Sequence, residues 1–174
     1  MVYDDLYYKA YDLVEELKAC DVKVAFAESL TGGMISSKLV DIEGASEVFA
    51  GSVVSYTNDV KKDILGVKEE TIEAFTEVSE ECAKEMALNV RKMMKADISV
   101  SATGYAGGYD NSNDYPDIDD DPDDQTGTVW FGFSTEDETF AVTQYFVGAR
   151  DAVRLQAVEF AFNLILEYLK ENYE

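Results

Sequence analysis

Apolar residues recur at steps of three and four along several stretches of the chain, the spacing of one face of an α-helix. In residues 3–19 the stripe consists of Leu6, Ala10, Leu13, Val14 and Leu17. In residues 150–169 it consists of Val153, Ala157, Phe160, Ala161, Leu164 and Tyr168. Similar patterns predict helices over 31–40, 58–65 and 69–75, and a longer one, capped by Ser79, whose stripe ends at Met94.

Short apolar runs between these helices predict strands. They cover 22–27, 48–56 and 97–102, and a hairpin pairs 128–134 with 139–147 around the turn 135–138. Three strands separated by helices, followed by a hairpin and a helix, predict one α/β domain over residues 1–174. We expect a three-layer α/β/α sandwich whose five-stranded sheet is mixed and mostly parallel, with one antiparallel member from the hairpin.

The connection over residues 103–127 interrupts this alternation. Its part from 107 to 127 has no periodicity, and eight of the residues from Asp110 to Asp124 are aspartates. Such length predicts a functional or disordered loop, and the composition favours a solvated acidic one. Asp117, Asp119 and Asp121 alternate as calcium ligands do, but no turn glycine or distal glutamate follows in register, so cation binding is the weaker alternative.

Charge and composition exclude several classes of function. The net charge of −22 argues against binding to nucleic acid or to anionic membranes. No run is long enough for a membrane helix, and the acidic N-terminus is unlike a signal peptide, so we expect a cytoplasmic protein. Two cysteines are too few for a disulfide framework or a zinc site. The absence of histidine excludes Ser-His-Asp and Cys-His machinery.

One serine stands where a nucleophile would be useful. Ser29, in AESLTGG, lies between a predicted strand and a predicted helix, beside backbone N–H groups that favour negative charge. The same position suits a plain helix cap. Without histidine the base for a serine is a lysine with a lowered pKa, and Lys61 follows the second strand, five residues after Tyr56. If the two strands are neighbours, these three residues meet in one crevice, yet each also has a purely structural reading.

The blocks AESLTGG, SYTNDVKK, VSEECAKEMA, ADISVSATGYAGG, TGTVWFGF and FVGARDAVRLQAV resemble the C-terminal domain of the CinA (competence/damage-inducible) family, in the family's order over residues 27–158. The resemblance implies a nicotinamide-nucleotide amidase of the stand-alone type, which converts nicotinamide mononucleotide to nicotinate mononucleotide and ammonia. It implies that Ser29 is the nucleophile and that Tyr56 and Lys61 support it. It also suggests a dimer, and the mechanism needs no metal or cofactor.

From this resemblance we expect the oxyanion to be held at the start of the helix, by Thr31, Gly32 and Gly33, and the 5′-phosphate to meet Thr103, Gly104 and Arg150. Two departures from the family pattern bear on the substrate. The family's G-I-A-G-P-x-G becomes residues 104–108, GYAGG, and the connection before residue 127 is lengthened and acidic. The alternative function is therefore a catalytically silent module of the same fold that binds a nucleotide or another protein.

Overall fold

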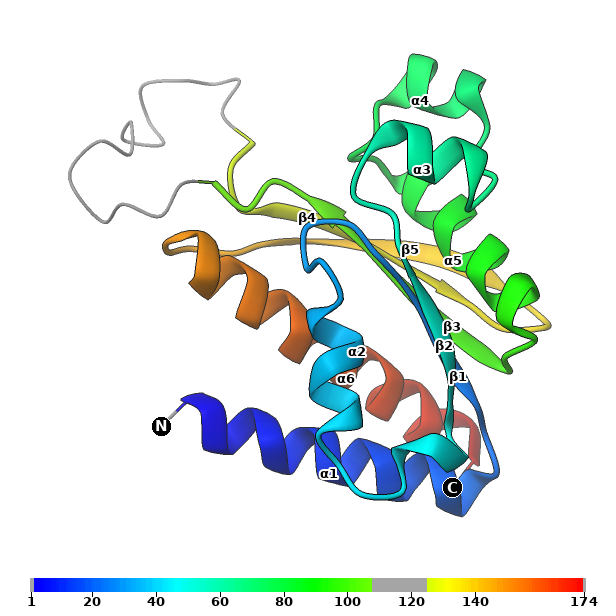
Figure 1. The fold of residues 1–174 in the computed structure, drawn as a ribbon, viewed down its shortest axis with the longest axis vertical. Coiled ribbons are helices and arrows are strands. Elements are labelled where there is room, and N and C mark those ends of the chain that lie inside the picture. The colour runs from blue at the N-terminus through cyan, green and yellow to red at the C-terminus, as the bar shows by residue number, and fades with distance from the viewer. Residues whose placement is uncertain (1, 108–124, 174) are drawn as a thin grey trace.

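A five-stranded sheet forms the centre of the molecule (Figure 1). The computed structural model describes residues 2–107 and 125–173. Its elements are α1 (Val2–Cys20), β1 (Val24–Glu28), α2 (Met34–Val40), the 3₁₀ turn η1 (Ala45–Glu47), β2 (Phe49–Val54), α3 (Asn58–Asp63), α4 (Glu69–Phe75), α5 (Glu80–Met94), β3 (Ile98–Gly104), β4 (Thr128–Ser134), β5 (Thr139–Tyr145) and α6 (Arg150–Tyr173). Most of the acidic segment predicted at 107–127 lies outside the described residues.

The strand order is β2-β1-β3-β4-β5. β1 pairs in parallel with β2 and with β3, whereas β4 pairs antiparallel with both β3 and β5. Four strands therefore run in one direction and β4 runs against them, which confirms the predicted mixed sheet. The carboxyl ends of β1, β2 and β3 lie together at one edge.

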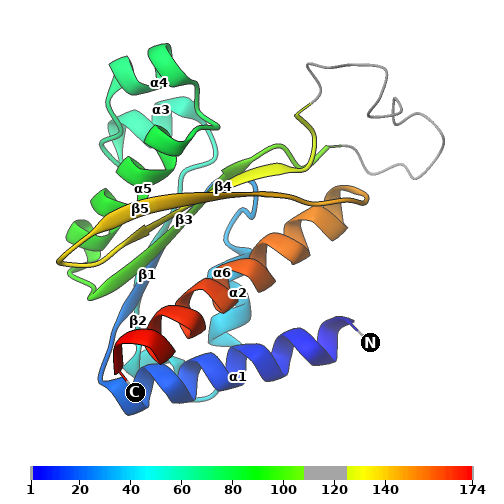
Figure 2. The same ribbon diagram turned by 180° about the vertical axis from the view of Figure 1, so that it is seen from behind.

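Helices cover both faces of the sheet. Figures 1 and 2 show α1, α2 and α6 on one face and α3, α4 and α5 on the other. β1 is buried along its whole length, because Val24 and Phe26 enter the larger core cluster while Ala25 and Ala27 enter the smaller one, beneath α5. A run of apolar residues without alternation is what a strand covered on both faces requires.

The predicted helix over 31–40 was too long at its start. Gly32 and Gly33 have positive φ angles of 58° and 96°, and α2 begins at Met34. Residues with positive φ cannot continue a right-handed helix, so residues 30–33 form a turn instead. The other predicted elements agree with the structure to within a few residues.

Candidate active site

Ser29 lies directly after β1, between its two neighbouring strands. Its backbone N–H donates to the carbonyl of Ala102 in β3 at 2.9 Å, and the carbonyl of Glu28 accepts from the N–H of Ser55 after β2 at 2.8 Å. The Ser29 residue is 7% exposed. The sheet thus fixes the serine at the edge where ligands bind in open α/β folds.

The turn after Ser29 is closed by the preceding residue. The buried Glu28 carboxylate accepts from the backbone N–H groups of Ile35 at 2.8 Å and Ser36 at 3.1 Å, and from the Ser36 hydroxyl at 2.6 Å. The N–H of Gly32 donates back to the carbonyl of Ser29 at 3.0 Å. The carboxylate satisfies two of the free donors at the start of α2, so those donors hold the turn in place rather than facing the cleft.

Arg154 of α6 secures the same turn from outside. Its Nε donates to the carbonyl of Leu30 at 2.9 Å, and its Nη2 donates to the carbonyl of Thr31 at 3.0 Å. In a trans peptide the N–H points opposite to the carbonyl, so these bonds also fix the direction of the next two N–H groups. Arg154 therefore determines the orientation of the backbone that follows Ser29.

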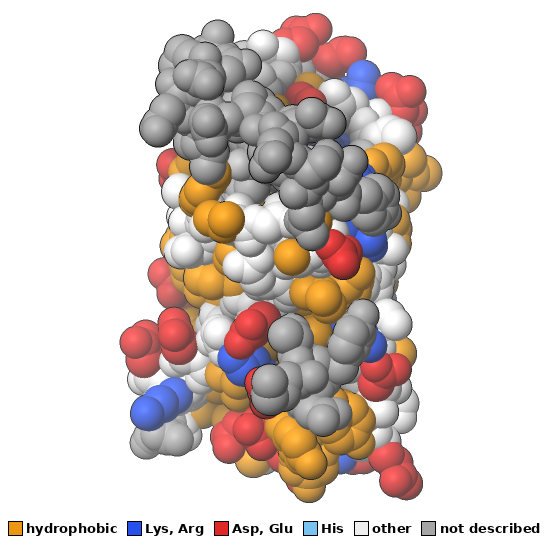
Figure 3. Space-filling view, turned by 90° about the vertical axis from the view of Figure 1, so that its left-hand side faces the viewer, with side chains coloured by type: hydrophobic (Ala, Val, Ile, Leu, Met, Phe, Trp, Pro, Cys, Tyr) orange, Lys and Arg blue, Asp and Glu red, His pale blue; other side chains and the backbone are white. Residues whose placement is uncertain are grey.

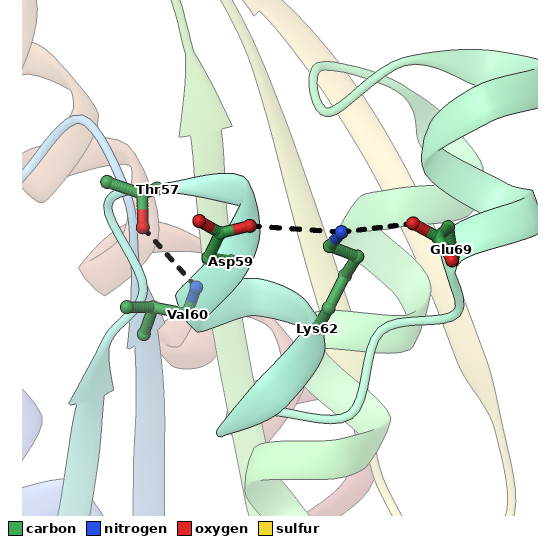
Figure 4. A network of polar contacts seen from close by, with 5 residues as sticks. All are labelled: Thr57, Asp59, Val60, Lys62 and Glu69. Atoms are coloured by element: carbon green, nitrogen blue, oxygen red, sulfur yellow. Dashed lines mark hydrogen bonds and ion pairs between the residues drawn. The ribbon is translucent and has the colours of Figure 1, made fainter.

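The short helix α3 positions Lys61 in the site. Thr57 caps α3, its hydroxyl accepting from the N–H of Val60 at 3.3 Å, and Figure 4 shows this cap beside a second contact on the outer side of the helix. There Lys62 lies between Asp59 and Glu69, at 3.8 and 3.2 Å. Consecutive helical residues point in different directions, so with Lys62 on the surface Lys61 turns inward and is 1% exposed.

Lys61 and Ser29 are in direct contact. Lys61 Nζ lies 3.0 Å from Ser29 Oγ and 3.5 Å from the carbonyl oxygen of Tyr56. Burial lowers the pKa of Lys61 below its usual 10.5, against the opposing influences of Cys82 and Glu77. Burial also raises the pKa of the Cys82 thiol to about 11, so at neutral pH this thiol is uncharged. The site thus pairs a hydroxyl with an amine whose neutral form is more accessible than that of an exposed lysine.

Tyr56 and Arg150 meet at the mouth of the site. Arg150 Nη2 donates to the Tyr56 hydroxyl at 3.1 Å, and Nη1 donates to the carbonyl of Gly107 at 2.9 Å. The residue Tyr56 is 57% exposed. Its side chain is therefore engaged with the arginine, while its backbone carbonyl is the part that contacts Lys61.

These residues line one cleft of about 450 Å³. Its lining also includes Glu77, Thr103, Gly104 and Tyr105. The Thr103 hydroxyl donates to the carbonyl of Glu77 at 2.7 Å, so it holds the opposite wall. A Cβ on Gly104 would lie 2.5 Å from the carbonyl oxygen of Thr128, which makes glycine necessary for the packing of β3 against β4.

The structure brings most of the predicted site residues to one cleft. Ser29, Tyr56 and Lys61 do meet, and Thr103, Gly104 and Arg150 line the same cleft. Thr31, Gly32 and Gly33 precede the helix rather than begin it, and they are not among the residues that line the cleft. Glu77 and Arg154 were not singled out from the sequence, although the spacing R-x-x-x-R places Arg150 and Arg154 on one side of a helix.

The described parts of the chain give no sign of a metal centre or a membrane span. Within residues 2–107 and 125–173, no three acidic or thiol side chains gather as metal ligands would. In the same ranges no helix combines the length and apolar character needed to cross a bilayer. Figure 3 shows acidic side chains spread over one face of the molecule, in keeping with the net charge of −22.

Comparison with known proteins relates this chain to the CinA family. The model of the CinA C-terminal domain matches residues 8–169. A CinA-like protein of Petrotoga mobilis is 45% identical over 161 residues, which are 92% of this chain and 38% of that protein. A CinA-like protein of a Thermotoga species is 40% identical over 158 residues, which are 91% of this chain and 36% of that protein. The chain thus spans less than half the length of these curated relatives.

Solved structures of this family match almost the whole of this chain and almost the whole of their own chains. A competence or damage-inducible protein from Enterobacter asburiae has a TM-score of 0.82 and 33% identity, with 94% of this chain and 98% of that chain covered. The competence/damage inducible protein CihA from Agrobacterium tumefaciens has a TM-score of 0.81 and 30% identity, with 95% and 96% covered. The chain therefore has the same fold as these solved structures.

Proposed function

The chain belongs to the CinA family, whose C-terminal domain it matches over residues 8–169. We propose that it is an amidohydrolase that converts nicotinamide mononucleotide to nicotinate mononucleotide and ammonia. The observation that carries this proposal is the 3.0 Å contact between Lys61 Nζ and Ser29 Oγ, with both residues buried. A serine is a weak nucleophile until a base removes its proton, and a lysine becomes such a base when its pKa is lowered.

Acylation begins with the neutral amine of Lys61. The amine takes the proton of Ser29 Oγ as this oxygen attacks the carboxamide carbon and forms a tetrahedral intermediate. The direct contact makes this the preferred route, because the hydroxyl of Tyr56 is engaged with Arg150. The Lys61 ammonium then returns the proton to the amide nitrogen, which leaves as ammonia, and the ester on Ser29 remains.

The turn after Ser29 supplies the donors for the oxyanion. The N–H of Gly32 is bonded to the carbonyl of Ser29, and none of the three expected residues, Thr31, Gly32 and Gly33, is among those that line the cleft. Leu30, which directly follows the nucleophile and lines the cleft, is the residue of this turn whose N–H serves as the donor, as in other nucleophile turns. One such donor is typically worth about 3 kcal/mol in the transition state.

Deacylation repeats the chemistry with water. Lys61 accepts a proton from the attacking water, the tetrahedral intermediate collapses, and Ser29 Oγ recovers a proton as the carboxylate product forms. At the mouth of the cleft Arg150 meets the 5′-phosphate, near Thr103 and Gly104. In a protein with a net charge of −22, this local cation offsets the repulsion that a phosphate would otherwise encounter.

The proposal is tested by ammonia release from nicotinamide mononucleotide with the purified chain. We expect turnover by the wild type and its loss, by roughly four orders of magnitude or more, in Ser29→Ala. Ser37→Ala, an exposed serine on α2, is the matched control and should keep its activity. A wild type that binds the nucleotide without releasing ammonia would overturn the proposal in favour of a silent binding module, and an active, folded Ser29→Ala would overturn the covalent mechanism.

A further inference from the structure

The cleft contains one carboxylate that the proposed chemistry does not use. Glu77 lines the same cleft as Ser29 and Lys61. No ion pair or hydrogen bond holds its side-chain carboxylate within residues 2–107 and 125–173. In a protein that already carries a net charge of −22, a further unpaired acid in the cleft of the proposed nucleophile needs a reason.

The backbone around Glu77 is strained and firmly held. Thr76 has φ 71° and ψ 171°, a region taken almost entirely by glycine. The Thr103 hydroxyl binds the carbonyl of Glu77 at 2.7 Å, and the Ser79 hydroxyl binds the carbonyl of Thr76 at 2.9 Å. Such a conformation is energetically unfavourable and persists only where its surroundings enforce it. The fold therefore maintains the position of Glu77 at a cost.

The charges that line the cleft are arranged as a pair of opposite signs. Arg150 is anchored to Tyr56 and Gly107, while Glu77 is attached through its backbone to Thr103. Lys61 lines the same cleft, and burial lowers its pKa, which makes its neutral form more accessible than that of an exposed lysine. A ligand that matches this layout carries an anion for Arg150 and a cation close to the group that Ser29 attacks.

A nicotinamide nucleotide has that distribution of charge. Its phosphate is negative, and its pyridinium ring, which bears the carboxamide directly, is positive. The carboxamide carbon must lie about 3–3.5 Å from Ser29 Oγ for attack, so the ring is held in the part of the cleft that Ser29 and Lys61 line. An unpaired carboxylate lining the same cleft attracts the positive ring and has no such attraction for a neutral one.

We propose that Glu77 is a specificity-determining residue that selects carboxamides borne on a positively charged ring over the same carboxamides on a neutral ring. This inference rests on the proposed function, since it takes Ser29 to be the point of attack. The ligand class it assigns to the cleft is a zwitterion, with the cation beside Glu77 and the anion beside Arg150.

The test compares nicotinamide mononucleotide with its dihydro form, which keeps the phosphate and the carboxamide but has a neutral ring. Dissociation constants are measured by calorimetry in the Ser29→Ala background, so that the different reactivities of the two amides do not enter. We expect Glu77→Gln to reduce the preference for the pyridinium form by about tenfold, the scale of one charge pair in a partly desolvated site. Glu81→Gln, which removes the same charge from the first turn of α5 outside the cleft lining, should leave the preference unchanged.

The two proposals fail differently. If wild-type protein releases no ammonia from nicotinamide mononucleotide, the proposed function is wrong, while the binding preference still reports on Glu77. If the wild type is active but Glu77→Gln keeps the full preference for the charged ring, the inference about Glu77 is overturned. An equal loss of preference in Glu81→Gln would also overturn it, because the effect would then belong to the overall charge.

Discussion

The two walls of the cleft are built in different ways. The nucleophile wall, residues 29–33 with α3, is held by contacts that satisfy its backbone: the Glu28 carboxylate closes the turn, Arg154 binds two of its carbonyls, and Thr57 caps the helix. The recognition wall, Glu77 and residues 103–107 with Arg150, contains the strained Thr76 and an unpaired carboxylate.

This difference matches two demands on an enzyme. Covalent chemistry needs the nucleophile and its base fixed to within a fraction of an ångström, so their supports come from several elements. Recognition here involves one carboxylate, that of Glu77, which has no ion pair among the described residues, and a strained backbone at Thr76, which costs stability in the absence of the ligand. We therefore expect substitutions in the nucleophile wall to lower kcat and substitutions in the recognition wall to change KM or selectivity.

The largest effect should come from the base. Lys61→Arg keeps the positive charge but replaces a group that can become neutral with one that cannot, and we expect kcat to fall by roughly a thousandfold or more. Lys62→Arg is the matched control on the same helix, because the pKa of Lys62 is raised by Glu69 and the side chain lies on the surface. Steady-state assays of ammonia release compare the two. Substantial activity in Lys61→Arg would mean that Lys61 is an electrostatic anchor and that the base lies elsewhere.

The two arginines of α6 should separate the walls. Arg154→Ala releases the carbonyls of Leu30 and Thr31, and we expect kcat to fall by roughly 10–100-fold with little change in KM, because misplacement of a catalytic group by about 1 Å has effects of that size. Arg150→Ala removes the proposed phosphate contact and should raise KM by about tenfold or more with a smaller effect on kcat. Both parameters are measured for each variant, and the opposite assignment would refute the division into two walls.

The smallest effect concerns the strain at Thr76. Thr76→Gly removes the steric cost of φ 71° but adds flexibility to the unfolded chain, so we expect a net gain of about 1 kcal/mol in the free energy of unfolding. Urea denaturation at neutral pH measures it. Thr57→Gly serves as the contrast, because Thr57 is a helix cap in an ordinary extended conformation. This substitution should lower the free energy of unfolding of the protein. A destabilised Thr76→Gly would show that the turn around Glu77 is not strained.

Much of this arrangement followed from the sequence. The pattern of apolar residues placed every α-helix and strand of the described structure, but not the 3₁₀ turn η1. The strand ends at Ser29 and Tyr56 predicted the crevice, because parallel neighbours bring their carboxyl ends together. The resemblance to the CinA family added the roles of Ser29, Tyr56 and Lys61, which stay predictions.

Other features depend on contacts that no local pattern reveals. The turn at residues 31–33 required φ angles that Gly-Gly permits but does not enforce, and helical periodicity ran through it. Arg154 acts on carbonyls 123 and 124 residues away. Glu77 belongs to no recognisable sequence motif, and the strained backbone of the preceding Thr76 leaves no mark in the hydrophobic pattern.

If Lys61 accepts the Ser29 proton as a neutral amine, the pH dependence of kcat/KM must report the ionisation of this lysine. Below its pKa the lysine is an ammonium ion and cannot accept a proton, so kcat/KM should rise with pH and level off near that pKa, which burial places below 10.5. Glu77 raises the pKa of Lys61, so Glu77→Gln should move the rising limb to lower pH. The Cys82 thiol, with a pKa of about 11, stays neutral over this range, so Cys82→Ala should leave the limb in place. A flat pH profile of kcat/KM between about pH 6 and 10 would contradict the proposal that Lys61 is the base. A rising limb that Glu77→Gln does not move would contradict it as well.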